Sequence, residues 1–222
     1  MSAPVTYNPP RRRPGHESLE KLLDAAEDQL REEELDCFTV DKVLERAGVS
    51  VGSFYARFPA GKDALLTAVQ NRVYARMQPA ILEALEAQQQ VDQSLDQAVE
   101  RAFDVLIEQV MKERLLCRAF MMFSAFDPAM RLRGEQIHLE RRHAVAAVLA
   151  KHLAEIGHPD PEAAIDLAYA MYSSTMHGRL VFYGPSKIPR MGVNEDDIFA
   201  QLKVGITNFL RGNGSSQAKS TG

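Results

Sequence analysis

Residues 43–65 read VLERAGVSVGSFYARFPAGKDAL, and the glycine and proline residues in this stretch divide it into short helices. An apolar stripe at helical spacing ends at Gly48, and glycine readily adopts the left-handed backbone of a helix stop. Ser50 is suited to cap a further short helix that Pro59 closes, and Thr39 is suited to cap the helix before it. The stretch therefore predicts two short helices joined by a tight turn.

The second short helix carries mostly small side chains on its outer face. If Val49 and Phe54 point into the core, a set of small or polar residues faces outward: Ser50, Val51, Gly52, Ser53, Tyr55 and Ala56. Small side chains let a helix enter the DNA major groove, where hydroxyls bond to base edges and a valine methyl meets a thymine methyl. This is the geometry of a helix-turn-helix reader, although tight helix pairs also occur as plain structural corners.

Two further side chains favour a DNA-contacting surface over a structural corner. The Tyr55 hydroxyl is expected to reach a phosphate. Lys62 opens the next helix, where its charge adds to the positive end of the helix dipole and suits a phosphate. An N-terminal arm with Arg11, Arg12 and Arg13 is expected either to follow the phosphates or enter the minor groove, or to stay solvated.

The segment FTVDKVLERAGVSVGSFYARFPAGKDALL, residues 38–66, resembles the DNA-binding segment of TetR-family transcriptional regulators. The shared residues include Thr39, Gly52 and Lys62, and the preceding LLDAAEDQL matches the family's first helix. Val51 departs from the pattern, because the family often has lysine, arginine or proline there. The resemblance covers about residues 17–75. It implies that Thr39 and Lys62 bind DNA together with the residues of the outer face.

Nearly all of the chain predicts helix, and no segment alternates convincingly as a strand does. We expect an all-α protein of about nine helices, near 17–35, 39–47, 50–57, 62–88, 94–111, 113–126, 128–156, 161–183 and 195–211. Pro79 is expected to kink the fourth helix. The expected organisation is a basic arm (1–16), a three-helix DNA-binding domain (17–62), a helical ligand-binding and dimerisation domain (63–211) and a disordered tail (212–222).

Composition limits the alternatives. The net charge of −4 argues against a protein that is basic throughout, yet a local basic patch for DNA is compatible with it. No apolar run approaches the roughly 18 residues of a membrane span, and residues 1–20 lack a secretory signal's apolar core, so a cytoplasmic protein is expected. Cys37 and Cys117 lie far apart and are expected to be buried thiols.

The last two predicted helices carry small residues that permit close helix approach: Ala168, Ala170, Ser173, Ser174, Gly178 and Gly205. In TetR relatives the last two helices of each subunit form a four-helix dimer interface, so the resemblance implies a homodimer; ordinary core helices are the alternative. Dimerisation also has an independent reason. One short reading helix contacts too few base pairs, whereas a two-fold pair reads two half-sites about 34–36 Å apart.

Residues 115–126, LLCRAFMMFSAF, are apolar almost all round, and such a helix must be buried. Its aromatic and methionine side chains are either plain core or the wall of a pocket. The resemblance implies a pocket among the fourth to eighth helices for a small, largely apolar effector, which a few polar groups would orient. The candidate ligand-binding residues are Phe103, Phe120, Met121, Phe123, His138, Tyr169, Tyr172, Ser173 and His177.

An enzyme is the first rival hypothesis, because EQIH and ERRH at 135–138 and 140–143 share the Glu-x-x-His spacing of di-iron bundles. The second copy starts five residues after the first, which turns it about 140° around a helix, so the two cannot face one centre. No phosphate loop, zinc spacing or nucleophile elbow occurs, and we expect neither catalysis nor a cofactor. A helical interaction module without DNA binding is the second rival.

Overall fold

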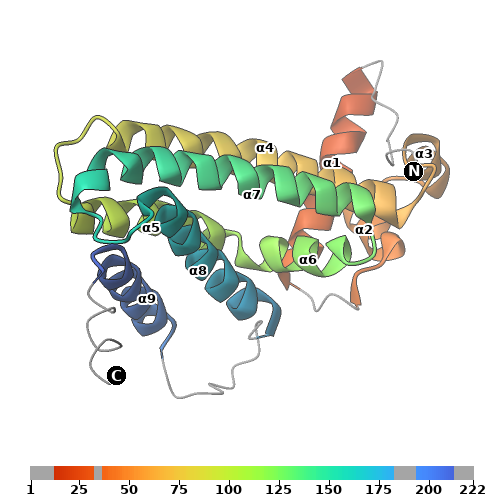
Figure 1. The fold of residues 1–222 in the computed structure, drawn as a ribbon. Coiled ribbons are helices and arrows are strands. Elements are labelled where there is room, and N and C mark those ends of the chain that lie inside the picture. The colour runs from red at the N-terminus through yellow and green to blue at the C-terminus, as the bar shows by residue number, and fades with distance from the viewer. Residues whose placement is uncertain (1–12, 33–36, 183–193, 213–222) are drawn as a thin grey trace. The chain divides into compact units, whose positions relative to one another are not determined.

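The computed structural model describes residues 13–32, 37–182 and 194–212 (Figure 1). The described residues form nine α-helices and a 3-10 helix, with no strand among them, which confirms the all-helical prediction. The elements are α1 (Arg13–Glu32), α2 (Val40–Ala47), α3 (Val51–Arg57), α4 (Lys62–Gln88), α5 (Leu95–Lys112), α6 (Arg114–Ser124), α7 (Pro128–Leu149), η2 (Ala150–Glu155), α8 (Pro161–Phe182) and α9 (Glu195–Leu210).

Two expectations about local structure were wrong. The sequence predicted one helix over 128–156, but α7 ends at Leu149 and the chain continues as the 3-10 helix η2. Within η2 the His152 imidazole and the Glu155 carboxylate are hydrogen-bonded at 2.8 Å, and this three-residue spacing suits a 3-10 turn. Cys37 is exposed rather than buried, because it lies in the connection before α2, whereas Cys117 on α6 is buried.

The chain divides into two compact units. Unit 1 comprises Met1–Arg76 and Arg114–Gln136, and unit 2 comprises Met77–Glu113 and Ile137–Gly222. This division differs from the predicted boundary at residue 62, because the first part of α4, all of α6 and the start of α7 belong with the helix-turn-helix segment. The Gln70 amide of α4, for example, donates to the carbonyl of Met130 at 3.1 Å.

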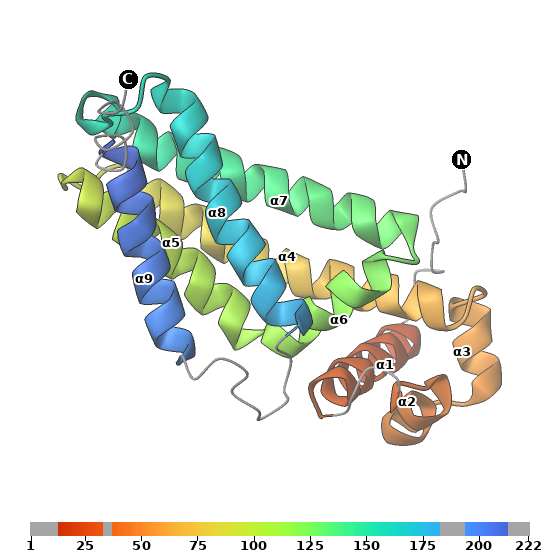
Figure 2. The same cartoon turned by 60° about the horizontal axis from the view of Figure 1, so that its bottom comes forward.

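The apolar core of unit 1 lies between α1, α2, α3 and the first part of α4. Its fully buried side chains include Leu22, Ala26, Val43, Phe54, Phe58, Leu65 and Val69. Figure 2 shows the three N-terminal helices grouped together, and α1 packs against both α2 and α6. The helical spacing of these apolar residues in the sequence is what places them on facing sides of the helices.

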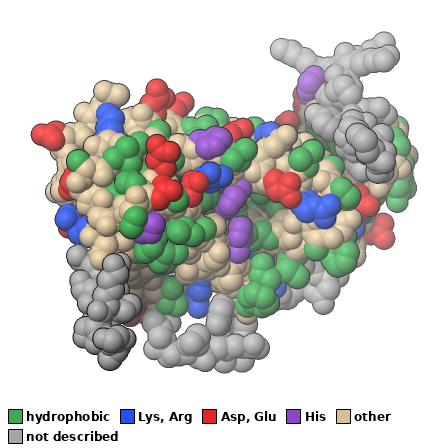
Figure 3. All heavy atoms as spheres, in the orientation of Figure 1, with side chains coloured by type: hydrophobic (Ala, Val, Ile, Leu, Met, Phe, Trp, Pro, Cys, Tyr) green, Lys and Arg blue, Asp and Glu red, His purple; other side chains and the backbone are tan. Residues whose placement is uncertain are grey.

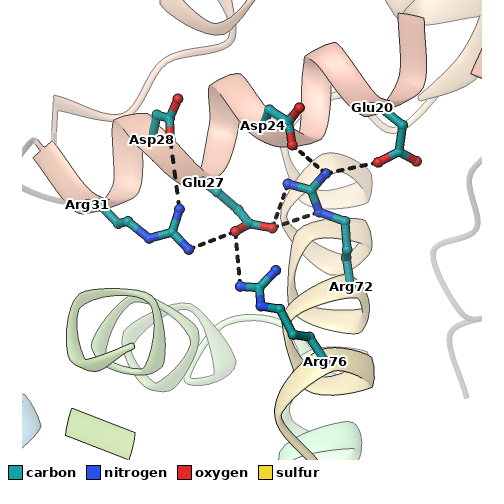
Figure 4. A network of polar contacts seen from close by, with 7 residues as sticks. All are labelled: Glu20, Asp24, Glu27, Asp28, Arg31, Arg72 and Arg76. Atoms are coloured by element: carbon teal, nitrogen blue, oxygen red, sulfur yellow. Dashed lines mark hydrogen bonds and ion pairs between the residues drawn. The ribbon is translucent and has the colours of Figure 1, made fainter. Parts of the chain in front are cut away.

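A network of ion pairs fastens α1 to α4 within unit 1 (Figure 4). The Glu27 side chain is only 4% exposed and its carboxylate contacts Arg72 at 2.6 Å, Arg31 at 2.9 Å and Arg76 at 3.2 Å. Arg72 also contacts Asp24 at 2.8 Å, and the network continues to Glu20 and Asp28 at its exposed edges. A buried charge is costly unless it is paired and hydrogen-bonded, and the three guanidinium groups meet this requirement for Glu27.

Unit 2 is built from α5, α8 and α9, with the later parts of α4 and α7. Helix α9 packs against both α8 and α5, and the views of Figures 1 and 2 agree with this arrangement. Helix α4 continues through Pro79 as one helix, although proline cannot donate the backbone hydrogen bond to the carbonyl four residues earlier. The Arg142 guanidinium of α7 binds Asp166 of α8 through two hydrogen bonds, of 2.8 and 2.7 Å.

Replacing Gly48 by alanine is expected to destabilise the protein by about 1–2 kcal/mol, because Gly48 has φ 63° and ψ 34°, which disfavours any Cβ. Replacing Gly52 by alanine is the matched control. Gly52 lies in α3, and a Cβ there would meet nothing within 4 Å, so this change should be neutral or stabilising by up to about 1 kcal/mol. Urea unfolding measures both, and equal effects would contradict the assignment of the turn to Gly48.

Candidate nucleic-acid interface

Local hydrogen bonds define the two short helices as the sequence predicted. Thr39 caps α2 by accepting from the backbone N–H of Lys42 at 3.4 Å, and Ser50 caps α3 by accepting from the N–H of Ser53 at 3.2 Å. Between them, the Gly48 N–H donates to the carbonyl of Glu45 at 3.3 Å in a left-handed stop. The turn between α2 and α3 is therefore fixed by residues that are three to five positions apart, since the Val49 N–H also donates to the Leu44 carbonyl at 3.2 Å.

The outer face of α3 is exposed to solvent. Phe54 and Phe58 are fully buried, and their burial turns the opposite side of the seven-residue helix to solvent. Val51 is 57% exposed and Tyr55 is 51% exposed. The rest of the predicted outer face is also exposed: Ser50, Gly52, Ser53 and Ala56. Val49 is half-buried, so the core-facing side of the turn rests mainly on Phe54.

The two serines of α3 differ in what they can offer to DNA. Ser50 Oγ accepts from the Ser53 N–H and donates to Ser53 Oγ at 2.9 Å, so the Ser50 hydroxyl is used within the protein. Ser53 Oγ accepts that bond, and its own hydrogen is left to donate outward. Ser53 is thereby suited to meet an acceptor on a base edge, such as a purine N7.

The structure gives Lys62 internal contacts that the sequence did not suggest. Lys62 is half-buried, and its ammonium donates to the carbonyl of Phe38 at 3.0 Å. The charge that was expected at a phosphate is thus engaged within unit 1. Arg11 and Arg12 lie outside the described residues. Arg13 begins α1, but its side chain is not among the described parts of the structure.

Two basic residues next to α3 were not among the predicted contacts. Lys42 and Arg46 are exposed on α2, one turn apart, and Arg46 forms a 2.7 Å ion pair with Glu32 of α1. The signal that could have identified them is their spacing, because residues four apart on a polar helix face lie side by side. On the face drawn in Figure 3, acidic and basic side chains are interspersed among hydrophobic ones.

The predicted ligand-binding residues fall into two groups. Phe120, Met121 and Phe123 lie on α6 and therefore in unit 1. The other six lie in unit 2: Phe103, His138, Tyr169, Tyr172, Ser173 and His177. The structure thus assigns six residues of the set to unit 2 and the three α6 residues to unit 1. The sequence could not show this, because the apolar pattern of α6 fits packing in either unit.

Five of the unit 2 residues form a continuous chain of aromatic rings from the core outward. Ring centroids are 5.3 Å apart for Phe103 and Tyr172, 5.8 Å for Tyr172 and Tyr169, 5.0 Å for Tyr169 and His138, and 5.7 Å for His138 and His177. The Tyr169 hydroxyl donates to the carbonyl of His138 at 3.1 Å. Phe103, Tyr172 and Tyr169 are at most 4% exposed, so the inner part of the chain is core.

Burial sets the charge state of this ring chain. Burial lowers the pKa of His138, and the neighbouring charges of His177, Arg141 and Arg142 lower it further. Burial also lowers the pKa of His177 and raises the pKa of Tyr169. Both imidazoles and the phenol are therefore neutral at neutral pH, so the chain of rings carries no charge of its own.

Helices α8 and α9 expose several apolar and small side chains to solvent in the single chain. Leu167 and Met171 of α8 are 51% and 37% exposed, and Val204 of α9 is 52% exposed. Ala170, Ser174 and Gly205 are also exposed. On α8 the spacing of 167, 170, 171 and 174 places these residues on one helix face. We call the exposed residues on these two helices the α8–α9 face.

The Glu-x-x-His pairs on α7 do not assemble a centre. Glu140 accepts a hydrogen bond from the Gln78 amide at 2.9 Å, and His138 contacts Tyr169. In the part of the chain that the structure describes, no group of three His, Cys, Asp or Glu side chains is placed to hold a metal ion. Within the same residues, no helix is long and apolar enough to cross a membrane.

The capped helix pair and the exposed outer face of α3 define a helix-turn-helix DNA-binding protein. The family model described as "Bacterial regulatory proteins, tetR family" matches residues 22–69, which lie in unit 1. This match identifies residues 22–69 as the DNA-binding segment of TetR-family transcriptional regulators. The segment is therefore that of a DNA-binding regulator.

Solved structures share the fold over most of the chain. A putative TetR-family regulator from Mesorhizobium loti MAFF303099 has a TM-score of 0.64 at 15% identity, covering 90% of this chain and 96% of that chain. A transcriptional regulator from Rhodococcus sp. Rha1 also has a TM-score of 0.64, at 21% identity, covering 88% of this chain and 97% of that one. The TetR-family regulator PfmR from Thermus thermophilus has a TM-score of 0.58 at 13% identity, covering 86% and 97%. A search of curated protein sequences finds no match.

Proposed function

We propose that the chain acts as a homodimeric repressor that binds a palindromic DNA operator and is released from it by a small, largely apolar effector. The observation that carries this proposal is the exposed outer face of α3 opposite the buried Phe54 and Phe58. The outer face supplies Val51, Ser53 and Tyr55 to the major groove. A regulator of this kind works on chromosomal DNA, and we place it in the cytoplasm.

The α8–α9 face supports a homodimer. Its apolar residues are exposed in the single chain, and burying them against a second copy would bring two α3 helices to two half-sites. Two-fold symmetry in the protein requires a palindrome in the operator, with half-site centres about 34 Å apart or a multiple of it. A stable dimer interface buries about 800 Å² on each partner, a size that two helices can supply.

The ring chain of unit 2 supports an apolar or aromatic effector. Its inner rings are an uncharged aromatic core, and at its outer end the His138 and His177 imidazoles would supply hydrogen-bonding groups that orient a ligand. The effector would bind better to a dimer whose two α3 helices are spaced wrongly for the two half-sites. Its binding would therefore shift the protein toward that state and lower the affinity for DNA. A 100-fold release needs about 2.7 kcal/mol of differential binding.

Selection of bound DNA from a random pool tests the proposed function. We expect the full chain to enrich a palindrome, and substitution of Tyr55 by alanine to weaken binding to it without changing the fold. Enrichment of no sequence, or of sites without two-fold symmetry, would reject the operator. Screening small aromatic molecules for thermal stabilisation then tests the effector, because a ligand that binds the folded state raises Tm.

Deleting residues 1–14 is expected to make DNA binding less dependent on salt. The arm carries three arginines, and each phosphate they neutralise contributes about 0.9 to the slope of log K against log salt concentration. The measurement is a binding titration of the full and shortened chains over a range of salt. An unchanged slope would show that the arm does not contact phosphates.

A further inference from the structure

Lys62 opens α4 at the point where several parts of unit 1 meet. Its ammonium donates to the Phe38 carbonyl at 3.0 Å and lies 5.2 Å from the centroid of the Phe38 ring. The Phe123 ring of α6 lies 5.4 Å from the same ammonium. The two rings are 6.5 Å apart in an edge-to-face arrangement. A carbonyl and two aromatic rings thus surround one charge, and we call Lys62, Phe38 and Phe123 the Lys62 clamp.

The Lys62 clamp joins the two ends of the helix-turn-helix. Phe38 directly precedes Thr39, which caps α2, whereas Lys62 follows the last residue of α3 by five positions. The neighbouring carbonyl of Cys37 accepts from the Gln29 amide of α1 at 3.1 Å. The backbone just before α2 is therefore held by α1 on one carbonyl and by Lys62 on the next.

Phe123 connects the same point to α6. Close by, the Thr67 hydroxyl of α4 donates to the Asp127 carboxylate at 3.4 Å. About two turns further along α4, the Tyr74 ring lies 5.6 Å from the Phe120 ring. These contacts place α6 and the turn after it along the first part of α4, inside unit 1. In this position Phe123 contacts the charge that fixes the start of α2.

We propose that the Lys62 clamp sets the orientation of α3 for DNA, with Lys62, Phe38 and Phe123 as positioning residues. The role assigned to the Lys62 charge is internal rather than a phosphate contact, and Phe123 acts on DNA binding rather than as an effector-pocket wall. This inference rests on the proposed DNA binding by α3. The physical basis is that a partly desolvated ammonium over aromatic faces loses its attraction when either the charge or the ring is removed.

The test is a double-mutant cycle with Lys62→Met and Phe123→Leu, read as operator affinity at several salt concentrations without effector. Each single variant is expected to weaken binding on the order of tenfold, the scale of one cation–π contact. The double variant is expected to bind the operator no more weakly than whichever single variant has the lower affinity. The slope of log affinity against log salt concentration should stay unchanged in all three variants. Non-additivity arises because both changes remove one contact.

A different pattern would overturn the inference. If Lys62 contacts a phosphate, Lys62→Met alone lowers the salt slope by about 0.9 and Phe123→Leu leaves affinity unchanged. Phe123→Tyr keeps the ring and is expected to retain full affinity, which separates the ring's role from loss of volume. Lys21→Met is the matched lysine control, because Lys21 is exposed on α1 and its effect should add to that of Phe123→Leu.

A second readout keeps the clamp testable apart from the proposed function. The methylene protons next to the Lys62 ammonium should show upfield NMR shifts from the two rings, and Phe123→Leu should reduce these shifts. Normal shifts in the unaltered protein would overturn the clamp itself. A protein that shows the shifts but selects no DNA sequence would instead reject the proposed function and leave the clamp in place as a packing feature.

Discussion

Replacing Glu27 by alanine is expected to lower the free energy of unfolding by about 3 kcal/mol. Glu27 is 4% exposed and is the shared partner of Arg31, Arg72 and Arg76, so its loss removes the centre of the network that joins α1 to α4. The value is at the lower end for a broken buried pair, because the arginines keep some contact with water and Arg72 keeps Asp24 and Glu20. Urea unfolding at pH 7 measures the effect.

Asp28→Ala is the matched control for Glu27. Asp28 lies one residue away in the same network, but its side chain is 53% exposed and is 3.7 Å from Arg31. An exposed pair of this kind contributes about 0–1 kcal/mol, so the variant should unfold nearly as the unaltered protein does. Equal losses for the two variants would show that the network is not centred on Glu27.

The stabilisation by Glu27 is also expected to depend on pH. Burial raises the pKa of Glu27, but hydrogen bonds and charges from Arg76 and Arg72 outweigh burial and lower the pKa below its ordinary value. A lowered pKa in the folded state means that the contribution is present above the unfolded pKa and is lost as pH falls through the folded pKa. The difference in stability between the unaltered protein and Glu27→Gln should therefore shrink in acid.

Placing glutamate at both Leu167 and Val204 is expected to convert the protein to a monomer and to weaken binding to its operator at least about 100-fold. The α8–α9 face would then bring like charges together, and one α3 helix alone retains little more than non-specific affinity. Sedimentation velocity gives the mass, and a titration with the selected DNA gives the affinity. A dimer that survives both substitutions would show that the subunits join elsewhere.

Leu132→Glu is the matched control for the α8–α9 face. Leu132 is 56% exposed, close to the 51% of Leu167, but it lies on the unit 1 part of α7. This variant adds one negative charge where the paired substitution adds two, at a similar exposure, and it should leave both mass and affinity unaltered. A monomer in this variant as well would mean that added negative charge, rather than the position of the substitution, separates the subunits.

Local signals were sufficient to predict the helices and the helix-turn-helix. Gly48, Thr39 and Ser50 each act through hydrogen bonds to residues at most four positions away, so composition and spacing alone indicate them. The exposed side of α3 followed from one buried residue, Phe54, because a helix that buries one side exposes the other. The family match over residues 22–69 agrees with this segment.

Contacts between distant residues could not be predicted in the same way. The apolar pattern of α6 requires burial but does not say against which helices, and the assignment of Phe120 and Phe123 to unit 1 depends on α4 and α1. Lys62 has the sequence context of a phosphate contact, yet its carbonyl partner is 24 residues earlier and one of its rings is on α6. The ring chain of unit 2 likewise joins three separate helices.

The sequence by itself determined an all-helical regulator with a capped helix-turn-helix and an outward face of small residues on α3. Each of those features depends on hydrogen bonds and solvation within a few residues of the chain, so the neighbouring side chains alone decide it. Only the tertiary structure decided that Glu27 gathers three arginines, one of them 45 residues away, and that Lys62 is held between two rings. Desolvated charges need partners, and only the folded chain shows which distant groups supply them.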